Sequence, residues 1–545
     1  MTIIDFLENN SRTHGEEVAL VEINPLKKPE KYVTWKEYSL IEPGLSNEYR
    51  REITWARFDD ISNRFANMLL SRGVKKGDKV AILLMNSLEW LPIYFGILKT
   101  GALAVPLNYR YTQDEIKYCL DLAECSYLIF GVEFIGRIEA IFDVIPNIKY
   151  LIFVGENTPS FAESFDRQID YYSNNKPNIE LDLDDDAAIY FSSGTTGFPK
   201  AILHAHKALY NSAIIEQNHH RQKHGDCFLC IPPLYHTGAK MHWFGSLVSC
   251  SKAVLLKGVK PEWILETVSL EKCTNVWLLV PWVQDILDSL ERGDIKLEDY
   301  ETSQWTLMHV GAQPVPPSLI RRWLKVFPNH MYDTNYGLSE SIGPGCVHLG
   351  IENVEKVGSI GKAGFKWETK ITDEKHNEIT EPNKVGELAV KGPGVMKCYF
   401  NNEKATKEIL EDDWLYTGDM AKYDEDGFIY LVDRKKDVII TGGENLYPVQ
   451  IEDFLRANSK IKDVAVIGYP DDRLGEIACA IIEVKEGMTM TEDEVNEFSL
   501  GMPRYKRPRK IIFASVPRNP TGKIEKPKLR EIYCGFNLVE RETTK

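Results

Sequence analysis

A glycine-punctuated loop rich in hydroxyl side chains follows the short apolar run Ala187–Phe191. The loop reads Ser192-Ser193-Gly194-Thr195-Thr196-Gly197-Phe198-Pro199-Lys200. Glycines let the backbone approach a polyphosphate and turn N–H groups toward it, hydroxyls add donors, and Lys200 supplies a positive charge. The loop therefore indicates a phosphate-binding site. Runs of serine, threonine and glycine are also common in solvated loops, so the assignment depends on motifs elsewhere in the chain.

The spacing within this loop excludes a P-loop. A Walker sequence needs four residues between its glycines and a serine or threonine after its lysine. Here Gly194 and Gly197 are closer together, Pro199 precedes the lysine, and Ala201 follows it. An ordinary P-loop kinase or ATPase is therefore not expected.

Three further segments carry groups that a nucleotide needs. Tyr336-Gly337-Leu338-Ser339-Glu340 offers an aromatic face, a hydroxyl and a carboxylate, which suit base stacking, phosphate binding and a magnesium ion. The segment Trp414–Asp419 ends in a carboxylate that can accept both hydroxyls of a ribose. The segment Asn519–Lys523 presents one lysine on a proline–glycine turn. Each segment by itself is also typical of a structured turn.

Strand-like and helix-like segments alternate along the first part of the chain. Such alternation predicts an α/β fold, in which helices cover largely parallel sheets. The expected strands are Val80–Leu84, Tyr127–Phe130, Tyr150–Val154, Ala253–Leu256 and Thr306–Val310, and the expected helices include Trp55–Gly73 and Leu88–Lys99.

A change in the character of the sequence near residue 434, from apolar to charged, predicts a domain boundary. The 545 residues are too many for one core, and the charged run 433–437 between two apolar segments is typical of a linker. Beyond it we expect a helix at 448–458 and strands near 464–467, 478–484 and 510–514. The predicted organisation is a large N-terminal domain of several subdomains with helix-covered sheets at 1–433, a hinge at 434–437, and a small mobile α+β C-terminal domain at 438–545.

Composition excludes some classes of function. A formal net charge of −15 argues against nucleic-acid binding, since such proteins carry basic surfaces. The basic stretch 504–510 is the exception, and it indicates either a solvated loop or a patch for an anionic cofactor tail. Residues 1–17 lack the apolar core of a signal peptide, and no window approaches the ~18 apolar residues of a membrane span. We therefore expect a cytoplasmic protein.

The spacing of the cysteines and histidines in the sequence does not match that of a metal-binding motif. Cys227 and Cys230 form a lone Cys-x-x-Cys pair, which indicates core thiols rather than zinc or a redox dithiol. His219, His220 and His224 lie in a polar stretch for which we expect a solvated loop. A polar insertion at about 24–51 predicts a surface excursion. Its role and the oligomeric state stay open, and a homodimer is compatible with the sequence.

Together and in this order, these segments resemble the adenylate-forming superfamily of acyl-CoA synthetases, luciferases and peptide-synthetase adenylation domains. The resemblance covers nearly the whole chain. It implies a two-step reaction, in which a carboxylate attacks the α-phosphate of ATP to give acyl-adenylate and pyrophosphate, and a thiol then displaces AMP. ATP, Mg²⁺ and coenzyme A are the implied cofactors, and a small carboxylic acid is the implied substrate. Further segments that carry the resemblance are 310–314, Gly358–Gly361, Gly386–Leu388 and the block Trp414–Ile451.

The resemblance implies a role for each motif. The phosphate loop would hold the β- and γ-phosphates through Ser192, Ser193, Gly194, Thr195, Thr196, Gly197 and Lys200. Ser339 would bind the α-phosphate, and Glu340 would bind Mg²⁺. Ser339 departs from the usual threonine of the family but keeps the hydroxyl.

The remaining implied roles belong to the nucleoside and to the second step. Tyr336 would stack on adenine beside Gly311 and Ala312, Asp419 and Arg434 would bind ribose, and Lys523 would reach the carboxylate and α-phosphate oxygens. Relatives rotate the small domain about a hinge residue, which corresponds here to Lys436. The rotation would bring Gly442 and Gly443 to the site, where small residues leave room for a pantetheine arm.

His236 bears on the choice of acid. Amino-acid-activating relatives place an aspartate at this position, so its absence disfavours an amino acid substrate. His236 resembles the acyl-site gate of acyl- and aryl-CoA ligases, although a core histidine is the alternative. Lys240, His242, Trp243 and Phe244 are expected to line or flank the acyl pocket. A fatty, aromatic or functionalised acid fits this mixture equally.

Three functions are compatible with these motifs. The first is an acid–CoA ligase, and the second is an adenylating enzyme that passes its acyl group to a carrier-protein thiol or to oxygen. The third is a nucleotide-binding module that has lost catalysis. The presence of Glu340, Asp419, Arg434 and Lys523 together argues against the third.

Overall fold

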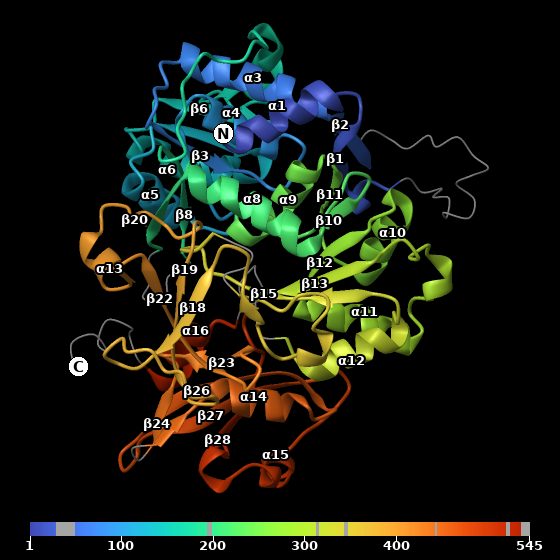
Figure 1. Ribbon diagram of the computed structural model, residues 1–545, viewed down its shortest axis with the longest axis vertical. Coiled ribbons are helices and arrows are strands. Elements are labelled where there is room, and N and C mark those ends of the chain that lie inside the picture. The colour runs from blue at the N-terminus through green and yellow to red at the C-terminus, as the bar shows by residue number, and fades with distance from the viewer. Residues whose placement is uncertain are drawn as a thin grey trace.

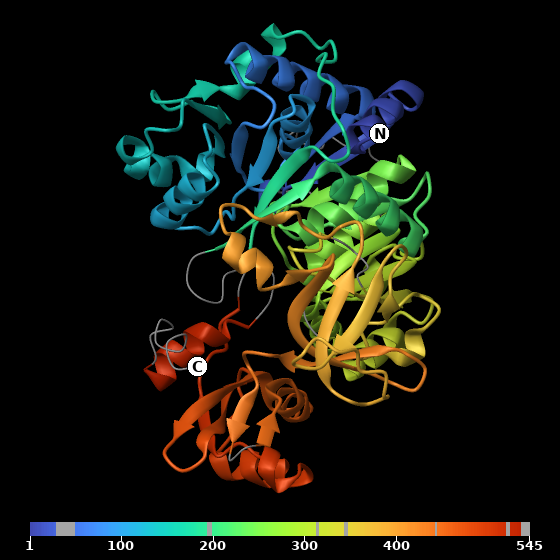
Figure 2. The ribbon, with the colours of Figure 1, turned by 60° about the vertical axis from the view of Figure 1, so that its left-hand side comes forward.

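The computed structural model of the protein describes residues 1–28, 49–192, 199–311, 315–342, 347–441, 444–518 and 524–535. Its strands form four sheets up to Arg434 and a fifth sheet beyond it. Figure 1 shows the fifth sheet with α14 and α15 at the bottom of the molecule, and Figure 2 shows the same separation from another direction. The expected α/β fold with a large N-terminal part and a smaller C-terminal part is confirmed.

The first sheet is mostly parallel and contains the strand that leads into the phosphate loop. Its strands are apolar and largely buried on both faces, as parallel strands between helices must be. β8 and β9 pair in antiparallel fashion, so residues 193–198 connect neighbouring strands. In spatial order the strands are β20 (Cys398–Tyr399), β9 (Ala201–Ala205), β8 (Asp186–Phe191), β4 (Leu103–Pro106), β3 (Lys79–Leu83), β5 (Tyr127–Gly131), β6 (Tyr150–Val154) and β7 (Glu163–Ser164).

The second sheet is parallel except at one edge, where β1 and β2 are antiparallel. In spatial order it contains β14 (Met331–Asp333), β13 (Leu307–Gly311), β12 (Asn275–Leu279), β10 (Cys227–Cys230), β11 (Lys252–Leu256), β1 (Val18–Ile23) and β2 (Arg50–Thr54). The helices that accompany the two sheets are α1 (Ile3–Thr13), α3 (Trp55–Ser71), α4 (Trp90–Lys99), α5 (Gln113–Leu122), α6 (Ile135–Ile141), α7 (Phe165–Gln168), α8 (His206–His220), α9 (Thr237–Ser249), α10 (Pro261–Glu271), α11 (Val280–Arg292) and α12 (Pro317–Val326).

Two smaller sheets carry the nucleotide motifs. One contains β15 (Asn335–Tyr336), β16 (Val347–His348) and β17 (Lys362–Ala363). The other contains β18 (Glu368–Thr372), β19 (Gly386–Lys391), β21 (Leu410–Glu411), β22 (Trp414–Tyr423) and β23 (Ile429–Arg434), and the short helix α13 (Glu403–Lys407) precedes β21. The register of β22 and β23 places Asp419 directly opposite Arg434, so pairing brings two predicted site residues together.

The C-terminal sheet has helices packed around it. It contains β24 (Ile439–Thr441), β25 (Glu444–Leu446), β26 (Ile461–Asp471), β27 (Gly475–Val484) and β28 (Lys510–Phe513), with helices α14 (Pro448–Arg456), α15 (Glu492–Phe498) and α16 (Lys526–Cys534). The expected linker is shorter than the charged run suggests, because Asp433 and Arg434 complete β23. Four residues, 435–438, separate this strand from β24.

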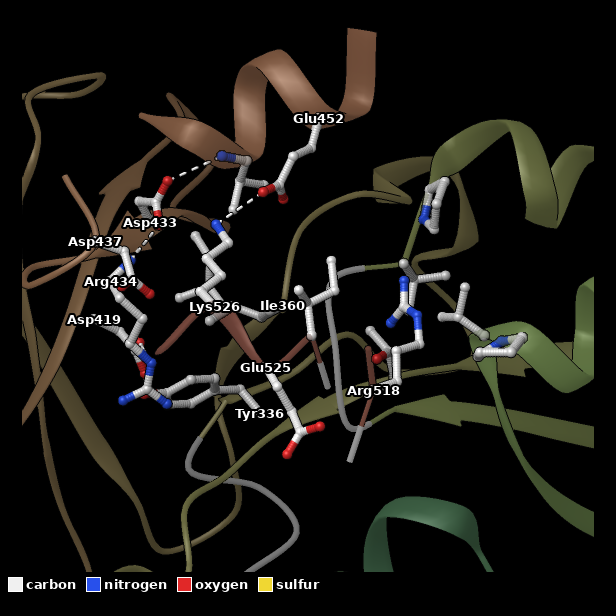
Figure 3. A pocket seen from close by; sticks show the side chains of 18 of the residues that line it. Tyr336, Ile360, Asp419, Asp433, Arg434, Asp437, Glu452, Arg518, Glu525 and Lys526 are labelled. Carbon is white, nitrogen blue, oxygen red and sulfur yellow. Dashed lines mark hydrogen bonds and ion pairs between the residues drawn. The ribbon is translucent and has the colours of Figure 1, made fainter. Parts of the chain in front are cut away.

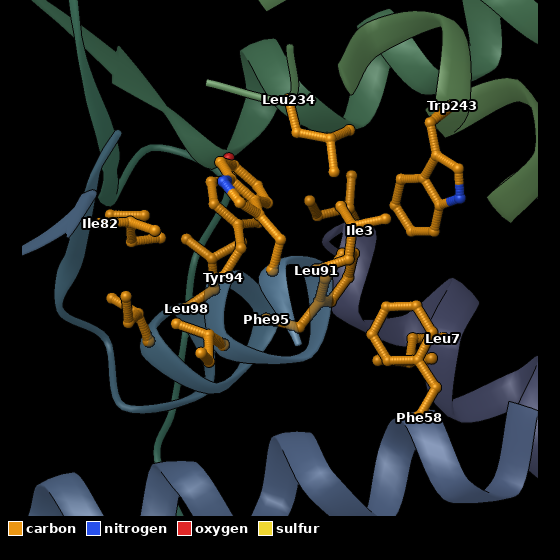
Figure 4. Close-up of a cluster of buried hydrophobic side chains, with 14 of the residues drawn as sticks. Ile3, Leu7, Phe58, Ile82, Leu91, Tyr94, Phe95, Leu98, Leu234 and Trp243 are labelled. Atoms are coloured by element: carbon orange, nitrogen blue, oxygen red, sulfur yellow. The ribbon is translucent and has the colours of Figure 1, made fainter. Parts of the chain in front are cut away.

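The largest apolar core joins the first two sheets through α4 and α9. Every residue of α4 is buried, which explains why its sequence is apolar on all sides. Figure 4 shows Leu91 and Phe95 of α4 packed near Trp243 of α9 and Phe58 of α3. Each such side chain stabilises the fold by about 1.5–3 kcal/mol through burial. This core therefore fixes α9, whose N-terminal end carries His236.

One sequence prediction is wrong, and a second is tested only at its ends. His219 and His220 belong to α8, and His220 is buried rather than solvated, because Glu216 one turn earlier pairs with it. Residues 50 and 51 of the expected surface excursion form β2 and pair with β1, and Tyr49 is buried, while 29–48 lie outside the described residues. The prediction of core thiols is confirmed, since Cys227 and Cys230 are free and buried.

Candidate active site

A cavity of about 3520 Å³ lies between the N-terminal sheets and the C-terminal part. Nine of the predicted site residues line it, all from the N-terminal part and the segment that follows β23. They are Ser192, Lys200, His236, Tyr336, Ser339, Glu340, Asp419, Arg434 and Lys436. Gly311 is the last residue of β13 and lies next to the cavity. A Cβ atom at this position would be 3.4 Å from the indole nitrogen of Trp277, which lines the cavity. The predicted residues outside the described part of the chain are Ser193, Gly194, Thr195, Thr196, Gly197, Ala312, Gly442, Gly443 and Lys523.

The best-defined cluster in the cavity joins Tyr336, Asp419 and Arg434 (Figure 3). The Tyr336 hydroxyl donates to Asp419 Oδ2, and Arg434 Nε donates to Asp419 Oδ1 at 2.6 Å. Burial and the adjacent Asp419 raise the pKa of Tyr336 well above its ordinary value, so the phenol remains a donor. Each carboxylate oxygen keeps further acceptor capacity, which two vicinal hydroxyls could use.

A second cluster connects Glu340 to the phosphate loop through Tyr399. The Tyr399 hydroxyl donates to Glu340 Oε1 at 2.8 Å, and Lys200 Nζ lies 4.8 Å from the centre of the Tyr399 ring. Sequence reasoning missed Tyr399, because this residue is 59 positions away from Glu340 in the chain. The pairing of β20 with β9 determines where its side chain lies. Its ring therefore lies between a cation and a carboxylate that could both serve a bound polyphosphate.

The ends of the phosphate loop are held together. The Ser192 N–H donates to the Lys200 carbonyl at 3.1 Å, and the Lys200 N–H donates to Ser192 Oγ at 3.2 Å. The adjacent strand residue His204 donates from Nε2 to the Ser339 carbonyl at 2.8 Å. Burial lowers the pKa of His204 to about 4, so the ring is neutral. His204 is a second residue that no sequence motif indicates.

His236 lines the cavity at the N-terminal end of α9. Its Nδ1 accepts the Gly238 N–H at 3.2 Å, and this bond caps the N-terminus of α9. His242 lines the cavity, as expected. Trp243 and Phe244 pack in the apolar core instead. Lys240 is fully buried behind the cavity, with Nζ 3.9 Å from the ring centre of Tyr190.

Ion pairs attach the segment after β23 to the C-terminal helices. Asp437 pairs with Arg530 of α16 at 2.8 Å, and Lys526 of α16 pairs with Glu452 of α14 at 2.9 Å. The Val449 N–H donates to Asp433 Oδ2 at 2.9 Å. Burial raises the pKa of Asp433 to about 6, against the lowering effect of Lys526. Figure 3 shows Asp433, Asp437, Glu452 and Lys526 beside the Tyr336 cluster.

In the part of the chain that the structure describes, none of the helices combines the length and apolar character needed to cross a membrane.

Comparison with known proteins identifies the matching family. The family model described as "AMP-binding enzyme" matches residues 22–400, and the model described as "AMP-binding enzyme C-terminal domain" matches residues 450–523. A long-chain-fatty-acid–CoA ligase of Mycobacterium tuberculosis, FadD13, is 30% identical over 491 residues, which cover 88% of this chain and 93% of that protein. A 2-succinylbenzoate–CoA ligase of Bacillus cereus is 30% identical over 463 residues, which cover 84% of this chain and 89% of that protein.

A solved structure of a CoA synthetase aligns with nearly the whole chain. The o-succinylbenzoate-CoA synthetase MenE from Bacillus subtilis, in complex with its acyl-adenylate intermediate, aligns with a TM-score of 0.79 and 25% identity. The alignment covers 96% of this chain and 98% of that chain. The same protein in complex with ATP and a magnesium ion also aligns with a TM-score of 0.79.

Proposed function

Since the chain belongs to the AMP-binding enzyme family and is an adenylate-forming acid–CoA ligase, we propose that the cavity described above hosts both half-reactions. The supporting observation is that Tyr336, Asp419 and Arg434 line the same cavity as Glu340 and Lys200. In the first half-reaction, a carboxylate oxygen bonds to the α-phosphorus of ATP and the bond to pyrophosphate breaks. In the second, the sulfur of CoA bonds to the acyl carbon and AMP leaves.

The nucleoside would occupy the Tyr336 cluster. The Tyr336 ring would stack on adenine, beside the backbone of Gly311 and Ala312. Asp419 would accept the two ribose hydroxyls. Arg434 holds the Asp419 carboxylate in place at 2.6 Å, so this acceptor is oriented before the nucleotide arrives.

The phosphates would lie between the loop Ser192–Lys200 and Glu340. Lys200 would neutralise the outer phosphates, and Ser339 would donate to the α-phosphate. Glu340 is the proposed Mg²⁺ ligand, because carboxylate oxygen is the donor that this ion prefers, and Tyr399 holds only one of its two oxygens. The ion would offset the negative charge that opposes the approach of a carboxylate to a polyanion. Lys523 would bring a second cation from the C-terminal domain to the reacting oxygens.

The second half-reaction would use rotation of the C-terminal domain. We propose domains at 1–433 and 438–545, with a hinge at 434–437 and Lys436 as the residue that turns. Rotation would bring Gly442 and Gly443 to the cavity. In the basic stretch 504–510, Arg504 and Arg509 are exposed and could meet the phosphates of CoA.

The substrate class is a carboxylic acid without an α-amino group. His236 stands where amino-acid-activating relatives have an aspartate, and an ammonium buried without a carboxylate partner costs several kcal/mol, on the order of 3–5. The two relatives above are named for a long-chain fatty acid and for 2-succinylbenzoate. A panel of acids must therefore span both types.

The test is to incubate the purified protein with ATP, Mg²⁺, CoA and one acid at a time. The panel contains medium- and long-chain fatty acids, benzoate, 2-succinylbenzoate and α-amino acids. We expect AMP and an acyl-CoA thioester with at least one simple acid and no carrier protein, and no turnover with amino acids. Thioester formation that requires a carrier protein would favour the carrier-dependent enzyme. Absence of AMP and of pyrophosphate exchange with every acid would favour a non-catalytic nucleotide-binding module.

A further inference from the structure

A group of buried titratable side chains lies behind the strand that leads to Tyr336. His220 ends α8, Asp333 ends β14 and His348 ends β16. The side chains of these three residues are at most 3% exposed. One ligand atom from each lies within 4.8 Å of the other two. The chain thus brings two imidazoles and one carboxylate to a single point from three separate elements.

Hydrogen bonding leaves one oxygen of Asp333 unsatisfied. Asp333 Oδ2 is buried and has no hydrogen-bond partner of ordinary geometry among the described residues. It nevertheless lies 2.9 Å from His348 Nδ1. Two lone pairs at this distance repel each other unless a cation or a proton lies between them.

The other oxygen of Asp333 is already engaged. Asp333 Oδ1 accepts the N–H groups of Thr334 and Gly350 at 2.7 and 2.8 Å. These bonds orient the carboxylate so that Oδ2 faces the two histidines. Oδ2 lies 3.4 Å from His220 Nε2. His309 adds a further nitrogen, since its Nδ1 lies 3.1 Å from the same His220 atom.

These separations match those between ligands of a tetrahedral metal ion. Zinc binds nitrogen and oxygen at about 2.0–2.2 Å, which places neighbouring tetrahedral ligands about 3.3 Å apart. The observed separations of 2.9 and 3.4 Å bracket that value. Magnesium and calcium favour oxygen donors alone, whereas two imidazoles with one carboxylate suit zinc.

Glu216 supplies the partner that a metal-binding histidine needs. Glu216 Oε1 lies 2.7 Å from His220 Nδ1 and 2.6 Å from His242 Nδ1, and its side chain is fully buried. In the first of these contacts the His220 Nδ1–H donates to the Glu216 carboxylate, so Nε2, which faces Asp333 and His309, is the nitrogen available to a metal, as in carboxylate–histidine–zinc arrangements.

We propose that His220, Asp333 and His348 bind a zinc ion, with Glu216 as the positioning residue for His220. A divalent ion balances the charges of Asp333 and Glu216, which are otherwise costly to bury. The ion would tie α8, β14 and β16 together directly behind the strand that carries Tyr336. Through Glu216, it would also fix His242, which lines the cavity. This zinc site is separate from the magnesium that Glu340 would bind, because the ligand types differ.

The first test measures the metal content of the purified protein. The protein is prepared without a histidine tag, dialysed against weak chelator, and analysed by inductively coupled plasma mass spectrometry. We expect about one zinc ion per chain. Asp333→Asn and His348→Ala should lose nearly all of it, and Glu216→Gln should weaken zinc affinity by about 10- to 100-fold. His330→Asn is the matched control, because this histidine contacts Trp305 and Phe327 and not the cluster, and it should retain zinc.

A second measurement on the unaltered protein decides the question if the variants do not fold. The zinc X-ray absorption spectrum should show nitrogen and oxygen neighbours near 2.0–2.2 Å and no sulfur. Removal of zinc should lower the Tm, and zinc but not magnesium should restore it. The proposal is overturned if the protein carries no zinc and binds none when it is added, or if the spectrum shows sulfur ligands. It is also overturned if folded Asp333→Asn and His348→Ala retain the ion. Any of these outcomes would mean that hydrogen bonds alone, and no metal ion, connect the three side chains.

Discussion

Glu340 and Tyr399 form a hydrogen-bonded pair where the proposed Mg²⁺ would bind. Glu340→Gln removes one charged ligand, so we expect lower activity and a higher Mg²⁺ concentration at half-maximal adenylation. Tyr399→Phe removes the hydroxyl that orients Glu340 at 2.8 Å, so it should shift the Mg²⁺ titration in the same direction but less. Pyrophosphate exchange measured at a series of Mg²⁺ concentrations gives the midpoint of the titration for both variants. An unchanged midpoint in Glu340→Gln would remove this residue from the metal site.

The proposed role of Lys523 differs between the two half-reactions. Lys523→Ala should slow adenylate formation by about 10²- to 10³-fold, because a positioned cation stabilises the charge of the first transition state by ~3–4 kcal/mol. Thioester formation from pre-made acyl-adenylate should change much less. Lys460→Ala is the control, since it removes an equal charge from the C-terminal domain at a surface pair with Glu494. Equal losses in both half-reactions would contradict the proposed role.

At the scale of elements, the segment after β23 has an anchor on each side. The Lys435 N–H donates to the Gly418 carbonyl at 2.9 Å, which attaches it to the N-terminal sheet. Asp437 pairs with Arg530 of α16 at 2.8 Å, which attaches it to the C-terminal part. Lys436 lies between these anchors, and the N–H groups of Asp437 and Val438 donate across it to the Arg434 carbonyl at 2.9 and 3.1 Å. A change in its backbone angles could therefore rotate one part against the other while both anchors stay in place, with loss of the two bonds to Arg434.

Proline at position 436 tests this hinge. Proline fixes φ near −65°, so Lys436→Pro should trap one arrangement of the domains. We expect adenylation within about tenfold of the parent and loss of most CoA-dependent thioester formation. Lys436→Ala removes the same side chain but leaves the backbone free, and it should support both steps. If the proline variant forms thioester from acyl-adenylate at the parental rate, the rotation occurs elsewhere.

The elements that the sequence predicts well are those defined by local patterns. The strands at 127–130 and 150–154 are continuous apolar runs, and the structure extends the first by one residue and leaves the second unchanged. The predicted helix at 55–73 ends instead at Ser71, because Gly73 adopts a positive φ of 82°. The family resemblance also implied one ribose site for Asp419 and Arg434, and their cross-strand register explains their proximity.

Contacts between distant elements were not predictable in the same way. Tyr399 reaches Glu340 only because a two-residue strand, β20, pairs with β9. The histidines at 219 and 220 lie in a polar sequence, which predicts solvent exposure, yet one face of α8 packs its polar groups against α9. No local pattern reveals that Glu216 would meet His242, because the partners are 26 residues apart on different helices.

At the scale of the whole molecule, stability should depend on pH through buried neutral histidines. Burial lowers the pKa of His204, His206 and His330 to about 4, against ~6.5 in the unfolded chain. Between pH 6.5 and 4 these three side chains bind protons in the unfolded chain but not in the folded protein, so they lower the free energy of unfolding as pH falls, by up to about 1.4 kcal/mol per pH unit for each histidine. Asp433 has the opposite effect, because burial raises its pKa to about 6 and it binds a proton first in the folded protein.

His206 offers the cleanest test of this dependence, because it is fully buried and neither ring nitrogen has a hydrogen-bond partner among the described residues. His206→Asn should reduce the change in unfolding free energy between pH 6.5 and 4 by about 3 kcal/mol, which corresponds to one proton over 2.5 pH units. Urea denaturation of parent and variant at pH 8, 6.5, 5.5 and 4.5 measures the slope. The free energies of unfolding of the two proteins at pH 8 are the reference, since none of these rings titrates there. Any stability that the variant loses because its side chain is smaller is the same at every pH. Parallel pH curves for the two proteins would show that His206 takes up its proton in the folded state as readily as in the unfolded chain.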